Sequence, residues 1–510
     1  MRQGSGRSAG VLVAAAALLT AGAVAVALWA SFPLGADGWA WPRVARPVWG
    51  DVVLPLMAFG LIGVLALAAW GWITRVGVGA EAALVVGLGA LGFLAQVVVA
   101  QQSPGGYQES LMALALPGPN RYHKAARGIE RLGPLLGRYP EWMGDDSHSL
   151  RITHPAGPVT FFWCLNQVFA GDEAGAKRFV QRCERRLAMG LRMREDSPGA
   201  KLFAGMSEAE LAGAWLATLL LRVVACLVVV PVYGLARGLY GRQAALAAAA
   251  FSTAIPSVLL FSPGLDQCYP TVAASACWLG YVAGCRRSAW RAALAGMVLS
   301  FGLFFSLAFV VAGLWSGLLA CAGLGRGDEP VGGRTVAKLA GAGAGGFLAP
   351  VVGLYAVFGY NSLAAWWGCW QGNARFNAAQ HRTYWKWVLL NPVEFLVFLG
   401  VPVACLSVRR FAAEVWELAH RRVAGRDWPT LIVAGLIVAL NVAGANLGEV
   451  GRLWMFLMPA CAMAAAAEVE RYAPYCRAVF IVLFGMQCVQ VVAFKGGLDV
   501  LLGLYRGLGG

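Results

Sequence analysis

Charged residues are scarce in this chain. Asp, Glu, Lys and Arg make up 13% of its 510 residues, whereas 59% are hydrophobic. A soluble domain carries charge on about a quarter of its residues, so the scarcity excludes an ordinary soluble protein. The apolar residues form long blocks, and each block approaches the ~20 residues that cross a bilayer as a helix. We predict an all-α, polytopic transmembrane helical bundle of about 12–14 spans.

The chain also lacks the cysteine spacing of a metal site or a disulfide scaffold. Its 12 cysteines are scattered, mostly inside apolar blocks, which is typical of small core residues. The net charge of +15 could indicate nucleic-acid binding, but the arginines fall in short loops such as "CRRSAWR" and "HRRVAGR". Arginines in such loops orient membrane helices, so we expect no nucleic-acid partner.

The apolar blocks predict where the spans lie. "MRQGSGR" precedes an apolar run that is too long for a cleaved signal, so we expect an uncleaved anchor. The stretch 289–321 is too long for one crossing and predicts a hairpin that turns near Ser300–Ser306. The other expected spans are 11–31, 52–73, 81–100, 209–236, 243–262, 269–285, 336–358, 390–407, 429–444, 453–467 and 478–494.

Basic residues orient the bundle. Arg2 and Arg7 predict a cytoplasmic N-terminus. The arginine-rich loops, which should share that side, are 286–291, 324–334 and 408–427. The loops then expected on the outer face are 101–155, 359–389 and 445–452. The apolar run 156–170 is short for a span, and the side of the charged segment 171–208 stays open.

The first outer loop is long and rich in acids. It should carry interfacial helices, since residues of "RYHKAARGIERLGPLLG" share one apolar face. Glu109 follows a Gly-Gly turn at the membrane boundary, where partial desolvation would make it a general base; a surface acid is the alternative. Asp145 and Asp146 could act as a base or bind a divalent metal such as Mg or Mn, or could simply cap a turn.

Cations and aromatic residues recur in the other outer segments. His154, between Thr153 and Pro155, could donate to a phosphate oxygen or be structural. The loop 359–389 combines tryptophans with cations, which suits a sugar and an anionic lipid headgroup, although tryptophans also collect at bilayer interfaces. The remaining candidate binding residues are Asp266, Arg375, His381, Arg382, Glu449 and Arg452, of which Glu449 and Arg452 could instead be an internal ion pair.

Four motifs together resemble the polytopic GT-C glycosyltransferases, which include protein mannosyltransferases and lipid A aminoarabinose transferases. They are "PNRYHKAA", with Arg121 and Tyr122, "THPAGPVTFFW", "LARGLYGRQAALAAAAFSTAIPSVLLFSPGLDQ" and "GEVGRLWMFLMP". The resemblance covers about residues 81–467. It implies a GT-C-like domain over 81–510, with 101–155 as the catalytic loop. The additional helix pair within 1–80 precedes the usual first span of the family and is a departure from its pattern.

The resemblance implies a function on the outer face of a membrane, expected to be the bacterial inner membrane. Such enzymes move a sugar from a polyprenyl-phosphate carrier to a glycan, lipid or protein acceptor. A carboxylate in the first outer loop takes the acceptor proton, and basic residues hold the lipid phosphate. The family commonly has an acidic pair before the Arg-Tyr, but Gly118, Pro119 and Asn120 stand there. Two alternatives remain: a transporter or flippase for a lipid-linked saccharide, and a catalytically silent protein of the same fold.

Overall fold

The computed structural model describes most of the chain. The described residues are 2–29, 34–36, 39–44, 52–103, 106–115, 121–144, 153–187, 205–326, 330–379, 381–420 and 427–501. Nearly all of them are helical, and one two-residue hairpin, β1 (Gly35–Ala36) with β2 (Trp39–Ala40), is antiparallel. The predicted all-α polytopic bundle is confirmed.

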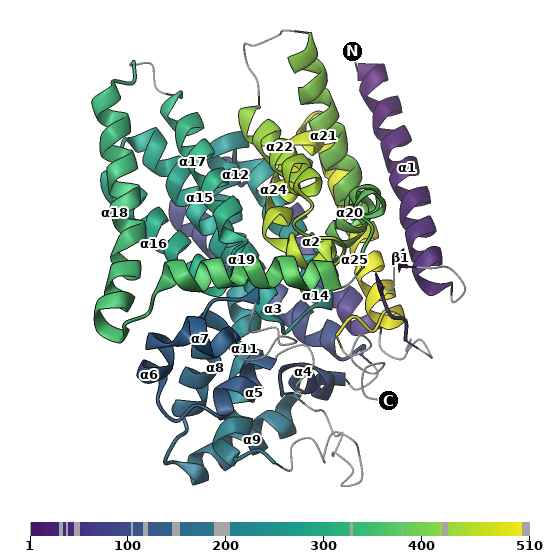
Figure 1. Ribbon diagram of the computed structural model, residues 1–510. Coiled ribbons are helices and arrows are strands. Elements are labelled where there is room, and N and C mark those ends of the chain that lie inside the picture. Colours follow the sequence, from purple (N-terminus) through teal and green to yellow (C-terminus); the bar gives the residue numbers. More distant parts are fainter. Residues whose placement is uncertain are drawn as a thin grey trace.

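The long helices form the bundle in Figure 1. Seven described helices are long and apolar enough to cross a membrane, or up to eight with one bent pair. They are α1 (Arg2–Leu28), α2 (Val53–Trp70), α3 (Val78–Ala100), α11 (Glu208–Cys226) continued by α12 (Val229–Tyr240), α13 (Arg242–Thr253) continued by α14 (Pro256–Leu260), α18 (Gly333–Phe358) and α25 (Cys476–Gly497). This number is below the 12–14 expected because several expected crossings are shorter helices.

The shorter helices complete the bundle and its ends. The bent pair is α20 (Tyr384–Leu399) and α21 (Val401–Ala419). Other bundle elements are η2 (Leu265–Cys268), α15 (Tyr269–Arg286), α16 (Ala289–Phe305), α17 (Phe309–Leu324), α19 (Ser362–Ala379), α22 (Trp428–Ala443), α23 (Val450–Leu453), η3 (Met455–Leu457) and α24 (Met458–Glu470). The predicted hairpin in 289–321 is confirmed, since α16 ends one residue before Ser306.

A cap of short helices covers one end of the bundle (Figure 1). We call the helices α4 to α9 the cap, and this end the cap end. They are α4 (Gly106–Ala115), α5 (Arg121–Arg127), α6 (Leu132–Gly137), α7 (Tyr139–Gly144), α8 (Gly157–Gln167) and α9 (Glu173–Leu187). The run 156–170 therefore belongs to the cap as the 11-residue α8. A single crossing, α11–α12, then connects the cap to the opposite end.

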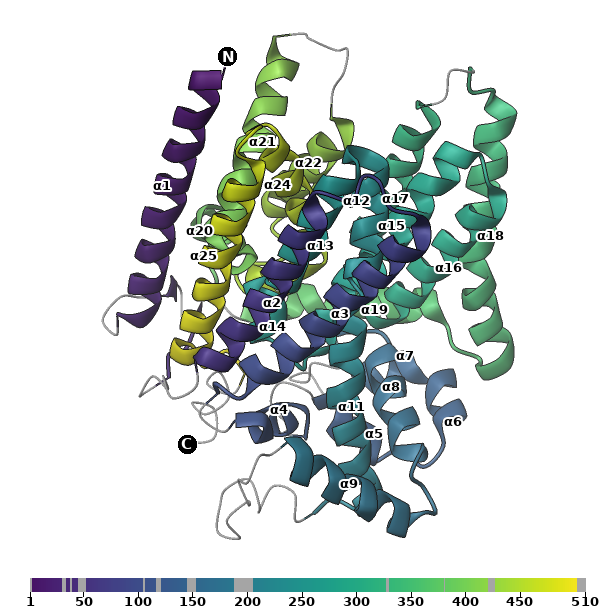
Figure 2. The ribbon, with the colours of Figure 1, turned by 180° about the vertical axis from the view of Figure 1, so that it is seen from behind.

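The two ends of the bundle separate the two kinds of loop. The chain begins at the end opposite the cap. At that same end α17 ends and α18 begins, and α21 ends and α22 begins (Figures 1 and 2). The helix α19 instead lies across the cap end, between the spans and the cap (Figure 1). The described parts of 324–334 and 408–427, two of the three stretches expected to be cytoplasmic, thus lie at the end opposite α19, which belongs to a stretch expected to be outer. Most of 408–427 is the end of α21 and not a loop.

The chain turns sharply between α20 and α21, by 120°. Gly400 occupies the break with a φ of 101°, a conformation that favours glycine. A break frees backbone groups that must be satisfied inside a bilayer. Two glutamines of α25 provide hydrogen bonds to these groups: Gln487 Nε2 donates to Leu399 O, and Gln490 Oε1 accepts from Val401 N. The bend is therefore built into the packing of α25.

Candidate functional site

The loop between α22 and α23 is held in a defined shape at the cap end. Gly448 and Glu449 both have positive φ, 88° and 60°. Asn391 of α20 holds the loop through two hydrogen bonds, since its Nδ2 donates to Asn446 O and its Oδ1 accepts from Gly448 N. Glu394 Oε1 accepts from Gly451 N at 2.8 Å. A left-handed glutamate is uncommon, and here it turns its carboxylate toward two arginines.

Four charged side chains of alternating sign meet at this loop, and we call them the charge chain. Arg382 Nη2 lies 3.4 Å from Glu449 Oε1, and Glu449 Oε2 lies 3.0 Å from Arg452 Nη2. Arg452 Nε in turn lies 3.5 Å from Asp266 Oδ2. The four come from η2, α23, the loop before α23 and the residues before α20. Four of the candidates predicted from the sequence are thus brought together.

The arginines of the charge chain differ in exposure. The Arg382 side chain is 3% exposed, stands 5.8 Å over the Trp387 ring and donates from Nη1 to Leu447 O. Arg452 and Asp266 are about one fifth exposed, at 22% and 21%. Arg382 therefore supports the loop, whereas Arg452 and Asp266 present charge at the surface of the site.

A second pair of predicted residues meets in the cap. The Tyr122 ring packs edge-on against the His154 ring, with centroids 5.4 Å apart. The Tyr139 hydroxyl donates to the carbonyls of His154 and Pro155, and Ala156 N donates to the Tyr360 hydroxyl. The segment before α8 is thus held by α7 and by the connection between α18 and α19.

His123, beside Tyr122, was not singled out from the sequence. It is fully buried, and its ring packs edge-on against Phe162. Burial, reinforced by the positive charge of Arg127, lowers the pKa of His123 to about 4 from the usual 6.5. The imidazole is therefore neutral at neutral pH and belongs to the core of the cap.

Glu109 lies on α4, where it is 3% exposed. It interacts electrostatically with Lys495, which is near the end of α25 and is 4% exposed. On the same helix, Tyr107 and Ser110 accept hydrogen bonds from the fully buried Arg222 of α11, at 2.6 and 2.7 Å. Sequence reasoning missed Arg222 and Lys495, although a single charge inside an apolar run is a recognised signal.

The remaining candidates are placed as follows. Arg375, near the end of α19, and His381 are exposed. Asp145, Asp146 and the side chain of Arg121 lie outside the described residues, so the expected roles of the three stay predictions. In the described part of the chain no three His, Cys, Asp or Glu side chains are grouped to hold a metal.

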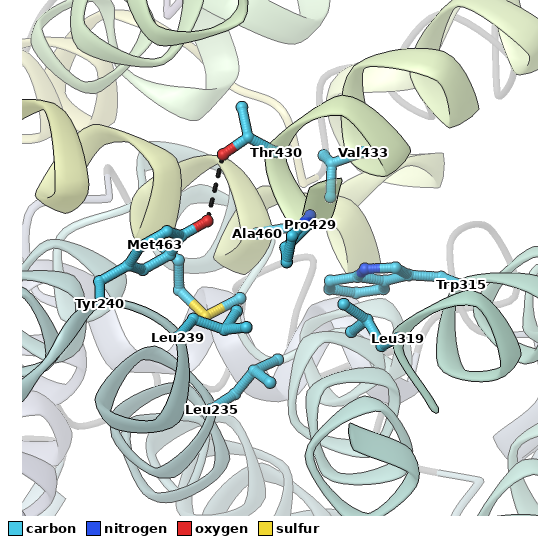
Figure 3. Close-up of a pocket in the computed structure, with 10 residues that line it drawn as sticks. All are labelled: Leu235, Leu239, Tyr240, Trp315, Leu319, Pro429, Thr430, Val433, Ala460 and Met463. Carbon is cyan, nitrogen blue, oxygen red and sulfur yellow. Dashed lines mark hydrogen bonds between the residues drawn. The ribbon is translucent and has the colours of Figure 1, made fainter. Parts of the chain in front are cut away.

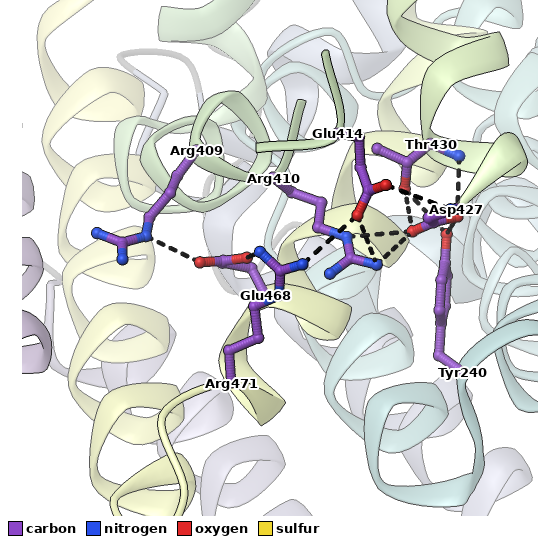
Figure 4. Close-up of polar contacts among 8 residues, drawn as sticks. All are labelled: Tyr240, Arg409, Arg410, Glu414, Asp427, Thr430, Glu468 and Arg471. Atoms are coloured by element: carbon purple, nitrogen blue, oxygen red, sulfur yellow. Dashed lines mark hydrogen bonds and ion pairs between the residues drawn. The ribbon is translucent and has the colours of Figure 1, made fainter. Parts of the chain in front are cut away.

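A second polar network lies at the opposite end of the bundle (Figure 4). Arg410 pairs with Asp427 at 2.7 Å and with Glu414 at 3.3 Å, and the Tyr240 hydroxyl donates to Asp427. Asp427 also caps α22 by accepting from Thr430 N. These contacts tie α12, α21 and α22 together.

An apolar void adjoins this second network (Figure 3). Its lining residues are Leu235, Leu239, Tyr240, Trp315, Leu319, Pro429, Thr430, Val433, Ala460 and Met463, and none of them is charged. A lining without a charged side chain does not suit a sugar phosphate, which leaves the charge chain as the better candidate site.

Comparison with known proteins gives few matches. No known protein family and no curated protein matches this sequence. Among solved structures, the chain is similar to the oligosaccharyltransferase of Archaeoglobus fulgidus, solved with zinc and sulfate, at a TM-score of 0.40 and 12% identity. The match covers 80% of this chain and 53% of that protein, so the chain spans about half of its length. A TM-score below 0.5 does not establish a common fold, and the function must be argued from the residues of this chain.

Proposed function

We propose that this protein is a membrane glycosyltransferase that moves a sugar from a polyprenyl-phosphate donor to an acceptor at the cap end of the bundle. The observation that carries the proposal is the charge chain, in which Arg452 stands between Asp266 and Glu449. The N–H groups of this guanidinium already bind carboxylate oxygens, and the same N–H groups can bind the oxygens of a phosphate.

The location of the charge chain supports a lipid-borne donor. The helix ends that adjoin the arginine-rich stretches lie at the opposite end of the bundle, so the positive-inside rule favours the cap end as the outer end. The phosphate of a polyprenyl carrier sits at the membrane surface, at the level where the spans end. Arg452, in the short helix α23 ahead of α24, lies at the cap end, where such a phosphate would be within its reach.

The charge chain also supplies a carboxylate for proton transfer. A donor phosphate that binds Arg452 would replace a carboxylate at the guanidinium. Asp266 would then be released from part of its ion pair with Arg452, and its carboxylate would be available to accept the proton of the acceptor hydroxyl. The competing proposal is that Glu109, the base expected from the sequence, takes this proton. Glu109 is less exposed than Asp266 and has Lys495 as a neighbour, which makes it the less accessible of the two carboxylates.

The second candidate function is transport of a lipid-linked saccharide. The interrupted pair α20 and α21 favours it, because broken helices surround substrate sites in many transporters. The two functions differ in product. A transferase separates the sugar from the polyprenyl phosphate, whereas a transporter changes the leaflet of an intact lipid-linked sugar.

The test is binding of polyprenyl phosphate to the full chain in lipid nanodiscs, with Arg452→Gln as the variant. Loss of the charged hydrogen bonds should weaken binding by roughly ten- to a hundredfold, since each contributes about 1.5–3 kcal/mol. The matched control is Arg409→Gln, which removes a half-exposed arginine paired with Glu468 at the opposite end.

The control should bind polyprenyl phosphate as the unaltered protein does. Equal affinity of Arg452→Gln and the unaltered protein would exclude a donor site at the charge chain. A labelled sugar on the same lipid then separates the two functions: release from the lipid indicates a transferase, and movement of the intact lipid between leaflets indicates a transporter.

A further inference from the structure

Helix α19 presents two chemically different faces. Small or polar residues are buried along one face: Ser362, Ala365, Cys369 and Gly372. Leu363, Trp367 and Trp370 are 70%, 63% and 61% exposed. Their spacing of four and three residues places all three on one side of the helix.

The buried face of α19 packs on three neighbours. Trp366 faces α18, with its ring centroid 6.1 Å from that of Phe347. Gly368 faces α7 so closely that an added Cβ would lie 3.3 Å from Met143 Sδ. Toward the C-terminal end, Asn373 and Asn377 both donate to Ala445 O, in the loop that carries the charge chain. The direction of α19 is therefore fixed by protein contacts, which leaves the tryptophan face outward.

The outward face continues the apolar surface of the spans that flank it. The end of α18 exposes Tyr355 and Val357, at 63% and 71%, and the start of α20 exposes Trp385, at 61%. Lys386 Nζ lies 5.9 Å from the Trp385 ring centroid, so a cation accompanies the aromatic surface. Tryptophan and lysine at the ends of spans mark the boundary between acyl chains and headgroups.

We propose that α19 is an in-plane membrane helix whose Leu363, Trp367 and Trp370 face inserts into the boundary of acyl chains and headgroups in the leaflet at the cap end. Its orientation across the spans and its apolar outer face are those of an interfacial helix (Figure 1). Through Asn373 and Asn377 the helix sets the height of the 445–452 loop relative to that leaflet. The two exposed tryptophans therefore contact lipid and do not form a platform for the sugar.

Photo-crosslinking in native membranes tests this assignment directly. Trp367 and Trp370 are replaced, one at a time, by a benzophenone amino acid in the full chain. Irradiation should give phospholipid adducts at both positions, detected by mass spectrometry. Val352 of the span α18, 60% exposed, is the lipid-facing control, and the exposed Arg138 between α6 and α7 is the water-facing control.

The outcomes separate the partners. Lipid adducts at 367, 370 and 352 but not at 138 support the proposal. Crosslinks from 367 and 370 to another polypeptide or a second copy of this chain would overturn it, as would no lipid adduct there while 352 gives one. The readout requires no transfer activity, so its failure is distinct from failure of the proposed function.

Discussion

The Nε atom of Arg452 and the Oδ2 atom of Asp266 lie 3.5 Å apart, although the two residues precede different helices of the bundle, α24 and α15. Their contact joins η2 to α23 at the cap end. Because both side chains are about one fifth exposed, the pair is accessible to a substrate as well as to each other. Because of the partly exposed Asp266–Arg452 pair, the charge chain reaches the surface of the site and is more than an internal contact between Glu449 and Arg452.

Replacement of Arg452 by lysine should weaken use of the donor while the fold is retained. The guanidinium contacts Glu449 and Asp266 at once, and a single ammonium group cannot reproduce that fork. We expect polyprenyl-phosphate affinity to fall by about tenfold, consistent with loss of one charged hydrogen bond. Thermal unfolding in detergent should change little. Normal donor use by the lysine variant would make Arg452 only the structural partner of Glu449.

Replacement of Gly448 by alanine should destabilise the loop that carries the charge chain. Its φ is 88°, and an added Cβ would lie 2.9 Å from the Trp387 ring. Strain of this kind costs about 1–3 kcal/mol. The variant should unfold at a lower temperature and lose polyprenyl-phosphate affinity.

The control for that substitution is Gly435→Ala, inside α22, where an added Cβ meets nothing within 4 Å. It should be neutral or more stable, because alanine restricts the unfolded chain more than glycine does. A Gly448→Ala protein as stable and active as Gly435→Ala would show that the shape of the loop is unimportant.

The sequence predicted the elements whose signal is local. The length of 289–321 required a hairpin, and α16 and α17 meet beside Ser306. The spacing of Glu449 and Arg452 placed them on one helical turn, and they pair. The run 156–170 is a cap helix and not a span, because eleven helical residues reach only about half of a bilayer.

Contacts between distant segments could not be predicted from the sequence. Asp266 and Arg382 join the charge chain only because η2 and the turn before α20 meet at the same end. The charges of Arg222 and Lys495 in apolar runs were a usable signal, but their neighbours on α4 lie far away in the chain and could not be identified from it. The tryptophans of α19 looked uniform in sequence, whereas packing turns Trp366 inward and Trp367 outward.

The cap should lose stability on mild acidification because of His123. Burial lowers the pKa of His123 to about 4, while the unfolded chain keeps a value near 6.5. Above pH 6.5 both states are neutral, and the full stability is present. Between pH 6.5 and 4 the unfolded state alone takes up a proton, so stability falls by up to about 3 kcal/mol.

His123→Gln should remove this pH dependence from thermal unfolding measured between pH 7 and 4.5. The matched control, His420→Gln, changes an exposed histidine at the opposite end and should leave the dependence as in the unaltered protein. If the two variants respond to pH alike, protonation of His123 does not govern stability of the cap.

Labelling of introduced cysteines should verify the orientation of the bundle. In a background without the native cysteines, residues 138 and 375 at the cap end should react with an impermeant reagent in intact cells. Residue 420, at the end that carries the basic loops, should react only after permeabilisation. Reaction at 420 in intact cells would reverse the orientation and place the charge chain in the cytoplasm.

The identity of the catalytic base can be decided by comparing Asp266→Asn with Glu109→Gln. Each substitution keeps the shape of the side chain and removes its basic oxygen. Asp266 lies beside Arg452 and is partly exposed, so an acceptor hydroxyl can reach it. We expect Asp266→Asn to lower the transfer rate at saturating donor by at least about a hundredfold, the usual range for a general base, while polyprenyl phosphate still binds.

Glu109 occupies a different environment, which gives its substitution a different expected result. It is almost fully buried and interacts with Lys495, so Glu109→Gln leaves that ammonium with less compensating charge. Removing one partner of a buried pair costs about 3–5 kcal/mol, and the main effect should be a lower unfolding temperature, with transfer per folded molecule retained. A stable Glu109→Gln protein that binds polyprenyl phosphate but transfers no sugar, beside an active Asp266→Asn protein, would assign the base to Glu109 and leave Asp266 as a counter-ion of Arg452.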